Sequence, residues 1–110
     1  MKRSLLLTAG LLRRYSRRGN FHSDPDAAAG LGYERLVAQG MQAAAPAYGL
    51  LLDAWGDDWL DRGVLELKFV GMVVDGETVD AEVGIDGDTA TITVTVGDRT
   101  AVVGTAHRRA

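Results

Sequence analysis

Two residues in the first half of this sequence, His22 and Gly40, are of the types that serve proton transfer and oxyanion binding. His22 stands in a turn of polar and small residues, where an imidazole can act as a general base. Gly40 stands where a long, almost uncharged helix is expected to begin. The first N–H groups of a helix have no intrahelical acceptor and lie at its positive end, so they stabilise a carbonyl oxygen that gains negative charge. A base that faces such a group suits the chemistry of acyl thioesters.

Neighbouring residues are candidates for supporting roles. Asn20 could orient His22 or simply adopt a left-handed turn conformation. Asn20 and Gln39 are candidates for substrate binding, as is Arg17, which is otherwise a surface residue. Asp24 is expected to cap a helix rather than to act as a base. No acidic residue precedes Asp24, so an acid that assists His22 would have to come from elsewhere or be absent.

The composition restricts the kinds of site that the chain can form. A chain of 110 residues, 46% of them apolar, is expected to fold as one globular domain over residues 1–110. It has no cysteine, which excludes disulfides, a thiolate nucleophile and cysteine-ligated metals. Its two histidines stand far apart, which argues against a zinc or non-haem iron centre. We therefore expect neither a metal ion nor a cofactor.

The net charge of −3 conceals a basic N-terminal region that precedes every acidic residue. This region is either a solvated helix face or a landing site for an anionic ligand, such as the phosphates of coenzyme A or an acidic carrier protein. Nucleic acid fits poorly, because the chain is acidic overall and has no platform of aromatic and basic residues. The basic residues are Lys2, Arg3, Arg13, Arg14, Arg17 and Arg18.

The first residues have the outline of a secretory signal, with Lys2 and Arg3 followed by the apolar run SLLLTAGLL. That run is short, is followed by arginines and has no small-residue cleavage site. No segment reaches the ~20 apolar residues of a membrane span. We expect a cytoplasmic protein that makes no use of a membrane.

Short elements should position the histidine. The apolar run at residues 4–7 predicts an edge strand. Thr8 is a suitable N-cap for a helix that carries Leu11 and Leu12 on one face and arginines on the other. The run Ser23-Asp24-Pro25 predicts the start of a second short helix.

A long helix is expected over residues 39–54. This segment is apolar nearly all round, so it must be buried on most sides. Its single charge, Asp53, lies near the C-terminal end, where a carboxylate is unfavourable beside the helix dipole, and this predicts a salt bridge. Pro46 and Gly49 oppose helix continuity and predict a distortion.

Two other regions are expected to be irregular. Residues 56–62 form a polar break in which Trp59 and Leu60 are tucked inside. His107, beside two arginines near the end of the sequence, is expected in a frayed tail.

The second half alternates apolar and polar residues, as half-buried strands do. Asp75-Gly76, Asp86-Gly87 and Gly97-Asp98 are hairpin signals between them. The pattern predicts an antiparallel meander whose apolar face is covered by the long helix. One curled sheet wrapped around one central helix is the hot-dog fold, of the α+β class. The apolar positions of the three clearest patterns are Leu65, Leu67 and Phe69; Val79, Ala81, Val83 and Ile85; and Ile92, Val94 and Val96.

Two segments resemble a known family. Residues 15–24 together with the run VAQGM at 37–41 resemble the signature of MaoC-like hot-dog hydratases and dehydratases, and residues 56–76 resemble the strand region that follows it. The resemblance implies addition or removal of water at the double bond of an enoyl thioester carried by coenzyme A or a carrier protein. It also implies dimers in which two sheets join edge to edge.

The resemblance covers His22 and Gly40 but not the acid with which the family pairs its histidine. That aspartate stands five positions before the histidine, where this chain has Arg17, flanked by Ser16 and Arg18. The family's asparagine-proline before the histidine is reduced here to Asn20-Phe21.

Three functions from different classes are therefore open. The chain could be a hydratase or dehydratase in which His22 is the base and the Gly40 N–H binds the substrate oxygen. It could be a catalytically impaired subunit that pairs with an active hot-dog partner, as a homodimer or heterodimer of such chains would allow. A hot-dog thioesterase is the third, although that chemistry usually needs a carboxylate facing the central helix, and none is placed here.

Overall fold

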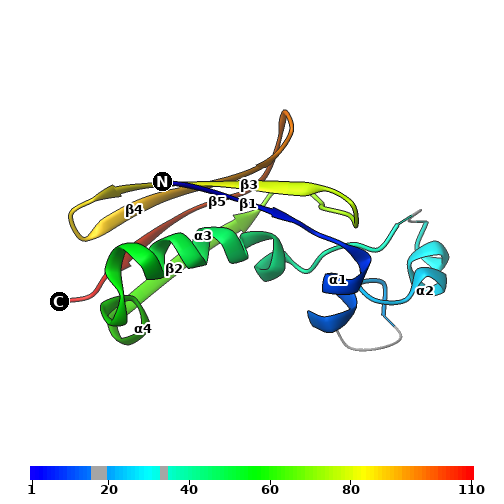
Figure 1. Ribbon diagram of the computed structural model, residues 1–110, viewed down its shortest axis with the longest axis horizontal. Helices are drawn as coiled ribbons and strands as arrows, with labels where there is room; N and C mark the ends of the chain where they lie inside the picture. The colour runs from blue at the N-terminus through cyan, green and yellow to red at the C-terminus, as the bar shows by residue number, and fades with distance from the viewer. Residues whose placement is uncertain (16–19, 33–34) are drawn as a thin grey trace.

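The computed structural model describes residues 1–15, 20–32 and 35–110. One antiparallel sheet and a layer of helices are formed within these ranges (Figure 1). The elements in chain order are β1 (Lys2–Leu6), α1 (Ala9–Tyr15), α2 (Pro25–Gly30), α3 (Gly40–Trp55), α4 (Asp57–Arg62), β2 (Gly63–Phe69), β3 (Thr78–Asp86), β4 (Thr89–Val96) and β5 (Arg99–Arg108).

The sheet has the strand order β1-β3-β4-β5-β2, and all of its neighbouring strands are antiparallel. Tight turns join β3 to β4 and β4 to β5 at Gly87 and Gly97, whose φ angles of 61° and 57° favour glycine. The expected meander is wrong at β2, which pairs with β5 rather than with β3. The Asp75-Gly76 signal therefore lies in a connection from the edge strand β2 to β3, across the sheet, and not in a hairpin.

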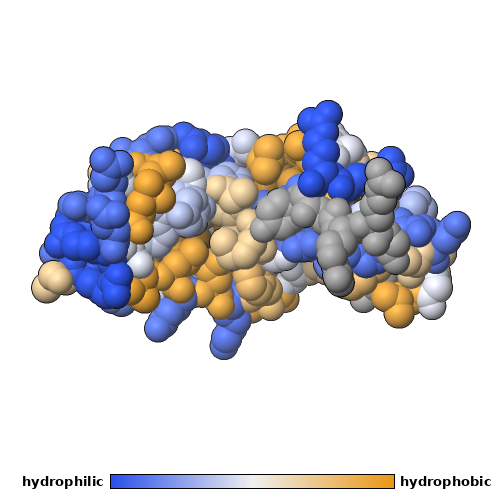
Figure 2. All heavy atoms as spheres, turned by 90° about the horizontal axis from the view of Figure 1, so that it is seen from below, coloured by the Kyte–Doolittle hydropathy of each residue, from blue (hydrophilic) through white to orange (hydrophobic). Residues whose placement is uncertain are grey.

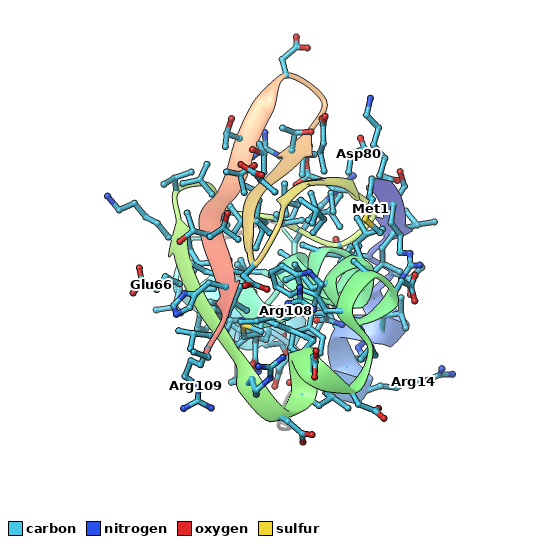
Figure 3. All side chains as sticks on the ribbon, turned by 90° about the vertical axis from the view of Figure 1, so that its left-hand side faces the viewer. Met1, Arg14, Glu66, Asp80, Arg108 and Arg109 are labelled. Carbon is cyan, nitrogen blue, oxygen red and sulfur yellow. The ribbon has the colours of Figure 1, made fainter. Side chains whose placement is uncertain are left out.

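Helix α3 lies against the concave face of the sheet, which curls around it when the molecule is viewed end-on (Figures 1 and 3). The alternation predicted for β3 and β4 is largely observed, since most of their apolar residues are buried and most intervening polar residues are exposed. Of the predicted inward positions, Ile85 is exposed and Val96 is half-buried. This arrangement confirms the hot-dog fold. The residues of α3 that are buried are Gln42, Ala43, Ala44, Pro46, Ala47, Leu50, Leu51 and Trp55.

Helix α3 runs from Gly40 to Trp55 with Pro46 inside it, so the proline does not end the helix. The salt bridge predicted for Asp53 is confirmed, because its carboxylate pairs with Arg3 of β1. The predicted caps are also confirmed. Thr8 Oγ1 accepts a hydrogen bond from the N–H of Leu11 at 3.1 Å, and the Asp24 side chain caps α2.

The polar break expected at residues 56–62 is in fact the short helix α4, with aspartates in its first turn and Arg62 in its last. Only one of its two apolar residues is tucked inside: Trp59 is 4% exposed, whereas Leu60 is 59% exposed. A helix turns successive side chains by about 100°, so two adjacent residues cannot both face the core here.

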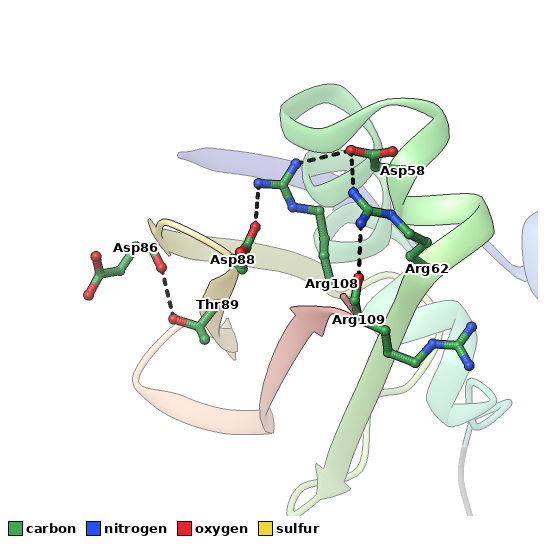
Figure 4. A network of polar contacts seen from close by, with 7 residues as sticks. All are labelled: Asp58, Arg62, Asp86, Asp88, Thr89, Arg108 and Arg109. Carbon is green, nitrogen blue, oxygen red and sulfur yellow. Dashed lines mark hydrogen bonds and ion pairs between the residues drawn. The ribbon is translucent and has the colours of Figure 1, made fainter.

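The expectation of a frayed tail at His107 is wrong. His107 belongs to β5, where it is paired with Val64 on one side and with Thr89 on the other. The next residue, Arg108, fixes this end of β5, since its guanidinium lies 2.7 Å from Asp88 and 3.4 Å from Asp58 (Figure 4). Figure 3 shows Arg108 between the sheet and the helices, in contrast to Glu66 on the outside.

In the three ranges that the structure covers, no helix is both long and apolar enough to cross a membrane.

Candidate active site

His22 lies in a turn that is shaped by its own side chains. The Oδ1 atom of Asn20 accepts hydrogen bonds from the His22 N–H at 3.0 Å and from the Ser23 hydroxyl at 3.3 Å. The backbone oxygen of Asn20 accepts from the N–H of Asp24 at 2.7 Å. A short polar side chain that bonds to the backbone two residues later is a common way to fix a turn. Asn20 thus fixes the backbone of this turn, while its expected role in substrate binding stays a prediction.

This turn is attached to the segment that leads into α3. The N–H of Val37 donates to the Phe21 carbonyl at 3.2 Å, and Nδ1 of His22 lies 2.6 Å from the Val37 carbonyl oxygen. The Phe21 ring lies against the imidazole, with ring centroids 3.9 Å apart. The N–H and the carbonyl of one residue, Val37, therefore both hold the histidine turn in place.

Residues 36–38 are held in turn by the connection between β2 and β3. Val37 forms a bridge with Val74, the N–H of Ala38 donates to the Val73 carbonyl at 2.8 Å, and the N–H of Asp75 donates to the Leu36 carbonyl at 2.9 Å. Leu36 and Val37 are only 2% and 6% exposed. The support of His22 therefore reaches into the core of the molecule.

Glu77 stabilises this supporting connection. Its carboxylate accepts a hydrogen bond from the N–H of Val74 at 3.0 Å and forms an ion pair with Arg99. Burial alone raises the pKa of Glu77, but the bonds from Val74 and Arg99 and the charges of Arg99 and Arg35 outweigh it, so the pKa lies below the usual 4.5. The carboxylate is therefore held in its charged form.

The N-terminus of α3 opens into a pocket. Gln39 is the N-cap, and its side chain makes no capping hydrogen bond, so it does not occupy the first free N–H groups of the helix. Gly40 is in close contact with Phe69, because a Cβ atom at this position would lie 2.7 Å from the Phe69 ring. The pocket has a volume of about 420 Å³ and a mostly apolar lining. It is lined by Ala38, Gln39, Gly40, Met41, Ala43, Phe69, Gly71, Met72, Val73 and Val102.

Several large apolar side chains around this pocket reach the surface. Phe69 and Val70 are each 51% exposed, Met72 is 44% exposed and Met41 is 40% exposed. The helix-bearing side of the molecule shows apolar surface between its charged side chains (Figure 2). An opening with such a rim, beside the first turn of a helix, can take an apolar molecule that carries one polar oxygen.

The sequence profile of the MaoC like domain matches residues 19–105, which include the histidine turn, the start of α3 and most of the sheet. The chain belongs to the MaoC-like domain family. No curated protein matches the sequence significantly.

Several solved structures share the fold of this chain. An (R)-hydratase from A. caviae involved in PHA biosynthesis is 24% identical, with a TM-score of 0.70 over 99% of this chain and 93% of its own. HtdX of Mycobacterium tuberculosis is 20% identical, with a TM-score of 0.81 over 97% of this chain but 47% of its own, so this chain spans about half of that protein. In the ChsH1-ChsH2 complex of Mycobacterium tuberculosis, the matched chain is 14% identical with a TM-score of 0.72, over 99% of this chain and 94% of its own.

Of the expected site residues that the structure describes, only two that are adjacent in the sequence lie at the pocket. Gln39 and Gly40 both line the pocket, and His22 is tied through Val37 to the segment that runs into it. His22 is not itself part of the pocket lining formed by the described residues. Arg17 lies outside the described residues, so its expected role stays a prediction.

Sequence analysis missed two aromatic residues near the candidate site. Phe21 was noted only as a departure from the family pattern, yet its ring lies against His22. Phe69 was expected to face the core from β2, but it lies at the pocket and is half exposed. The sequence feature that could have indicated the contact between Phe21 and His22 is the position of an aromatic residue directly before the histidine. Within the described ranges, no three His, Cys, Asp or Glu side chains gather as a metal site would require.

Proposed function

We propose that the chain is a hydratase or dehydratase of enoyl thioesters, in which His22 is the general base and the Gly40 N–H binds the thioester carbonyl oxygen. One observation supports this assignment above the others. The turn of His22 and the first turn of α3 are joined by the same short segment, residues 36–38, which is fixed on both of its sides. Catalysis needs a base and an oxyanion donor that keep a constant separation, and a shared rigid support provides it.

The chemistry follows from these two groups. In the hydration direction, His22 takes a proton from water while the water oxygen bonds to C3 of the enoyl group. The electrons of the C2–C3 double bond move toward the thioester carbonyl, whose oxygen becomes an enolate and accepts from the Gly40 N–H. The protonated His22 then gives this proton to C2, and the carbonyl re-forms. Dehydration is the reverse sequence. A positioned base contributes roughly 10²–10⁴-fold and one oxyanion donor roughly 10²–10³-fold to such a rate.

The pocket at the start of α3 suits the acyl part of the substrate. Gly40 provides the polar contact in its wall, while the side chains of Met41, Phe69, Met72 and Val73 provide an apolar surface. Such a division, with few polar groups in an apolar lining, orients a substrate by its one polar function. An acyl chain attached to coenzyme A or to a carrier protein is the substrate class that matches.

The assignment is tested by measuring hydration of enoyl-CoA thioesters of increasing chain length, through the loss of absorbance of the conjugated double bond. His22→Ala should lower kcat by at least about 10²-fold, since it removes the base. His107→Ala is the matched control, because His107 is exposed on β5 and should leave the rate unchanged. Turnover that survives His22→Ala, or no turnover and no binding of any acyl thioester, would show the assignment to be wrong.

A catalytically impaired subunit is the second candidate. It is favoured because the sequence offers no acidic residue before His22, and the first one after it, Asp24, already accepts other hydrogen bonds. These come from the N–H groups of Asp26 and Ala27, at 2.9 and 3.4 Å. Arg17→Asp separates the two candidates by placing a carboxylate where the family has one. A large gain in hydration indicates an impaired enzyme that depends on a partner, whereas a loss indicates that the natural sequence is already complete.

A further inference from the structure

The contacts of His22 determine which of its nitrogens can act. We infer that the Val37 carbonyl and the Phe21 ring hold His22 as the tautomer with its proton on Nδ1, and that Phe21 is a positioning residue for the base. The base itself is then Nε2. The identity of the reaction rests on the proposed function, but the tautomer and its cause rest on contacts alone.

The position of the proton follows from the Val37 contact. Nδ1 of His22 and the carbonyl oxygen of Val37 are 2.6 Å apart, within hydrogen-bond distance. A carbonyl oxygen can only accept, so Nδ1 must donate and carry the proton. In a neutral imidazole the other nitrogen then has the free electron pair. Nε2 is thus left as the atom that can remove a proton from water.

The carbonyl that makes this bond has a fixed direction. The N–H of the same residue, Val37, donates to the Phe21 carbonyl at 3.2 Å, and Val37 pairs with Val74 on its other side. Its side chain is 6% exposed, so the residue cannot turn without opening the core. The acceptor for Nδ1–H therefore stays in place when His22 gains or loses a proton.

Phe21 restricts the imidazole on another side. The two ring centroids are 3.9 Å apart, with an angle of 36° between the ring planes. Phe21 is itself packed against the hydrophobic core, so its ring offers a fixed surface. Rotation of His22 away from this surface would also break the bond from Nδ1 to Val37. The aromatic ring and the carbonyl together leave the imidazole one orientation.

This arrangement gives the histidine an orienting partner that is not a carboxylate. A base must keep its tautomer and direction to be effective, and a backbone carbonyl can fix both. The chain has no acid before Asp24, so the Val37 carbonyl and the Phe21 ring fix the tautomer and orientation of His22 that an acidic partner would otherwise help to fix. They act through His22 and do not touch the reacting atoms.

Nitrogen-15 NMR of the labelled, unmodified protein tests the tautomer without any substrate. The chain has two histidines, and His107→Asn assigns the remaining signals to His22. At a pH where the ring is neutral, we expect Nδ1 of His22 to show the shift of a protonated nitrogen and Nε2 that of an unprotonated one. A proton on Nε2, or rapid averaging of the two nitrogens, would overturn the inference.

The role of Phe21 is tested by a pair of variants. Phe21→Leu keeps an apolar side chain but removes the ring, and Phe21→Tyr keeps the ring. For Phe21→Leu we expect kcat to fall roughly tenfold with little change in KM, and the His22 nitrogen signals to move toward averaging, because the base loses its orientation. Phe21→Tyr should restore both. Equal effects of the two variants, or unchanged His22 signals in Phe21→Leu, would contradict a positioning role.

These measurements separate the inference from the function. If no acyl thioester is turned over but the nitrogen signals show the Nδ1–H tautomer and respond to Phe21→Leu, the proposed function fails and the inference stands. If turnover depends on His22 but the proton is on Nε2, the function stands and the inference fails.

Discussion

Gly40 both begins helix α3 and lines the pocket proposed for the substrate. The absence of a side chain lets the Phe69 ring approach the first turn of α3, and both residues line the same pocket. Glycine is favoured where another group must come close to the backbone. A substituent at Gly40 would not affect helix formation greatly, but it would displace the ring that borders the N–H group.

Gly40→Ala should therefore lower activity more than stability. The added Cβ would lie 2.7–2.8 Å from three atoms of the Phe69 ring, which is half exposed and can move into the pocket. We expect kcat/KM for an enoyl thioester to fall by roughly 10²-fold, while the free energy of unfolding changes by less than about 1 kcal/mol, since alanine is the better helix former. Steady-state kinetics and urea unfolding measure the two effects.

A double-mutant cycle shows whether the ring is the cause. In a Phe69→Ala background the same Gly40→Ala change should have a much smaller effect on kcat/KM, because no ring remains to be displaced. An equal loss in both backgrounds would mean that Gly40 acts through its backbone alone.

At this scale the sequence revealed the candidate residues but not their contacts. His22 and Gly40 were found from residue type, spacing and family resemblance, and the cap at Asp24 from its place before a proline. The contact of His22 with Val37 could not be predicted, because every residue has a backbone carbonyl and the sequence does not show which one the imidazole will reach. The half-exposed place of Phe69 depends on β2 being an edge strand.

Among the elements, the connection between β2 and β3 not only joins two strands but also supports the segment that holds His22. It crosses from one edge of the sheet toward the other and pairs with residues 36–38 on its way. Glu77 stabilises this connection by accepting a hydrogen bond from Val74 and pairing with Arg99. The stability of this loop and the position of His22 are therefore coupled.

Glu77→Gln should destabilise the protein in a way that disappears in acid. Because the folded-state pKa of Glu77 is lowered, its contribution is fully present above the usual value of 4.5 and is lost as the pH falls through the lower folded-state value. We expect a difference of about 0.5–1 kcal/mol in the free energy of unfolding near neutral pH. Urea unfolding of both proteins between neutral pH and the acid range measures it. A difference that grows as the pH falls would contradict the lowered pKa.

The main elements were predictable because their patterns are strong, and the failures have physical causes. The central helix was expected at residues 39–54 and is observed as Gly40–Trp55, since a long apolar run with so few charges has few other solutions. Helix α4 was missed because six residues are too few to show a helical period. The pairing of β2 with β5 was missed because alternation predicts a strand but not its neighbour.

For the whole molecule, the two edges of the sheet are unequal. β1 and β2 are the edge strands, and β2 ends at the exposed Phe69, with the exposed Val70 and Met72 just after it. Unpaired strand edges next to apolar surface tend to be covered by another chain. We therefore predict that the protein forms a dimer through the β2 edge, with the pocket at or near the contact.

Light scattering at micromolar concentration should give twice the chain mass of 11.7 kDa. Val70→Lys places a charge in the predicted contact and should shift the mass toward the monomer. Leu6→Lys is the matched control, because Leu6 is 50% exposed at the end of the opposite edge strand and should leave the dimer intact. A monomer for the unmodified chain, or dissociation by Leu6→Lys alone, would show that the β2 edge is not the contact.

The strand order also has a consequence for the newly made protein. In the part of the chain that the structure describes, β2 pairs with β5 alone, and β5 is made after β3 and β4. On the ribosome, β2 and the apolar residues that follow it emerge first and stay unpaired until Arg99–Arg108 has also left the exit tunnel, a delay on the order of seconds. During this interval the unpaired segment is the part of the nascent chain most suited to capture by a chaperone. A released chain that ends before Arg99 should therefore be open to proteolysis within residues 63–73, and extending it through Arg108 should protect that segment.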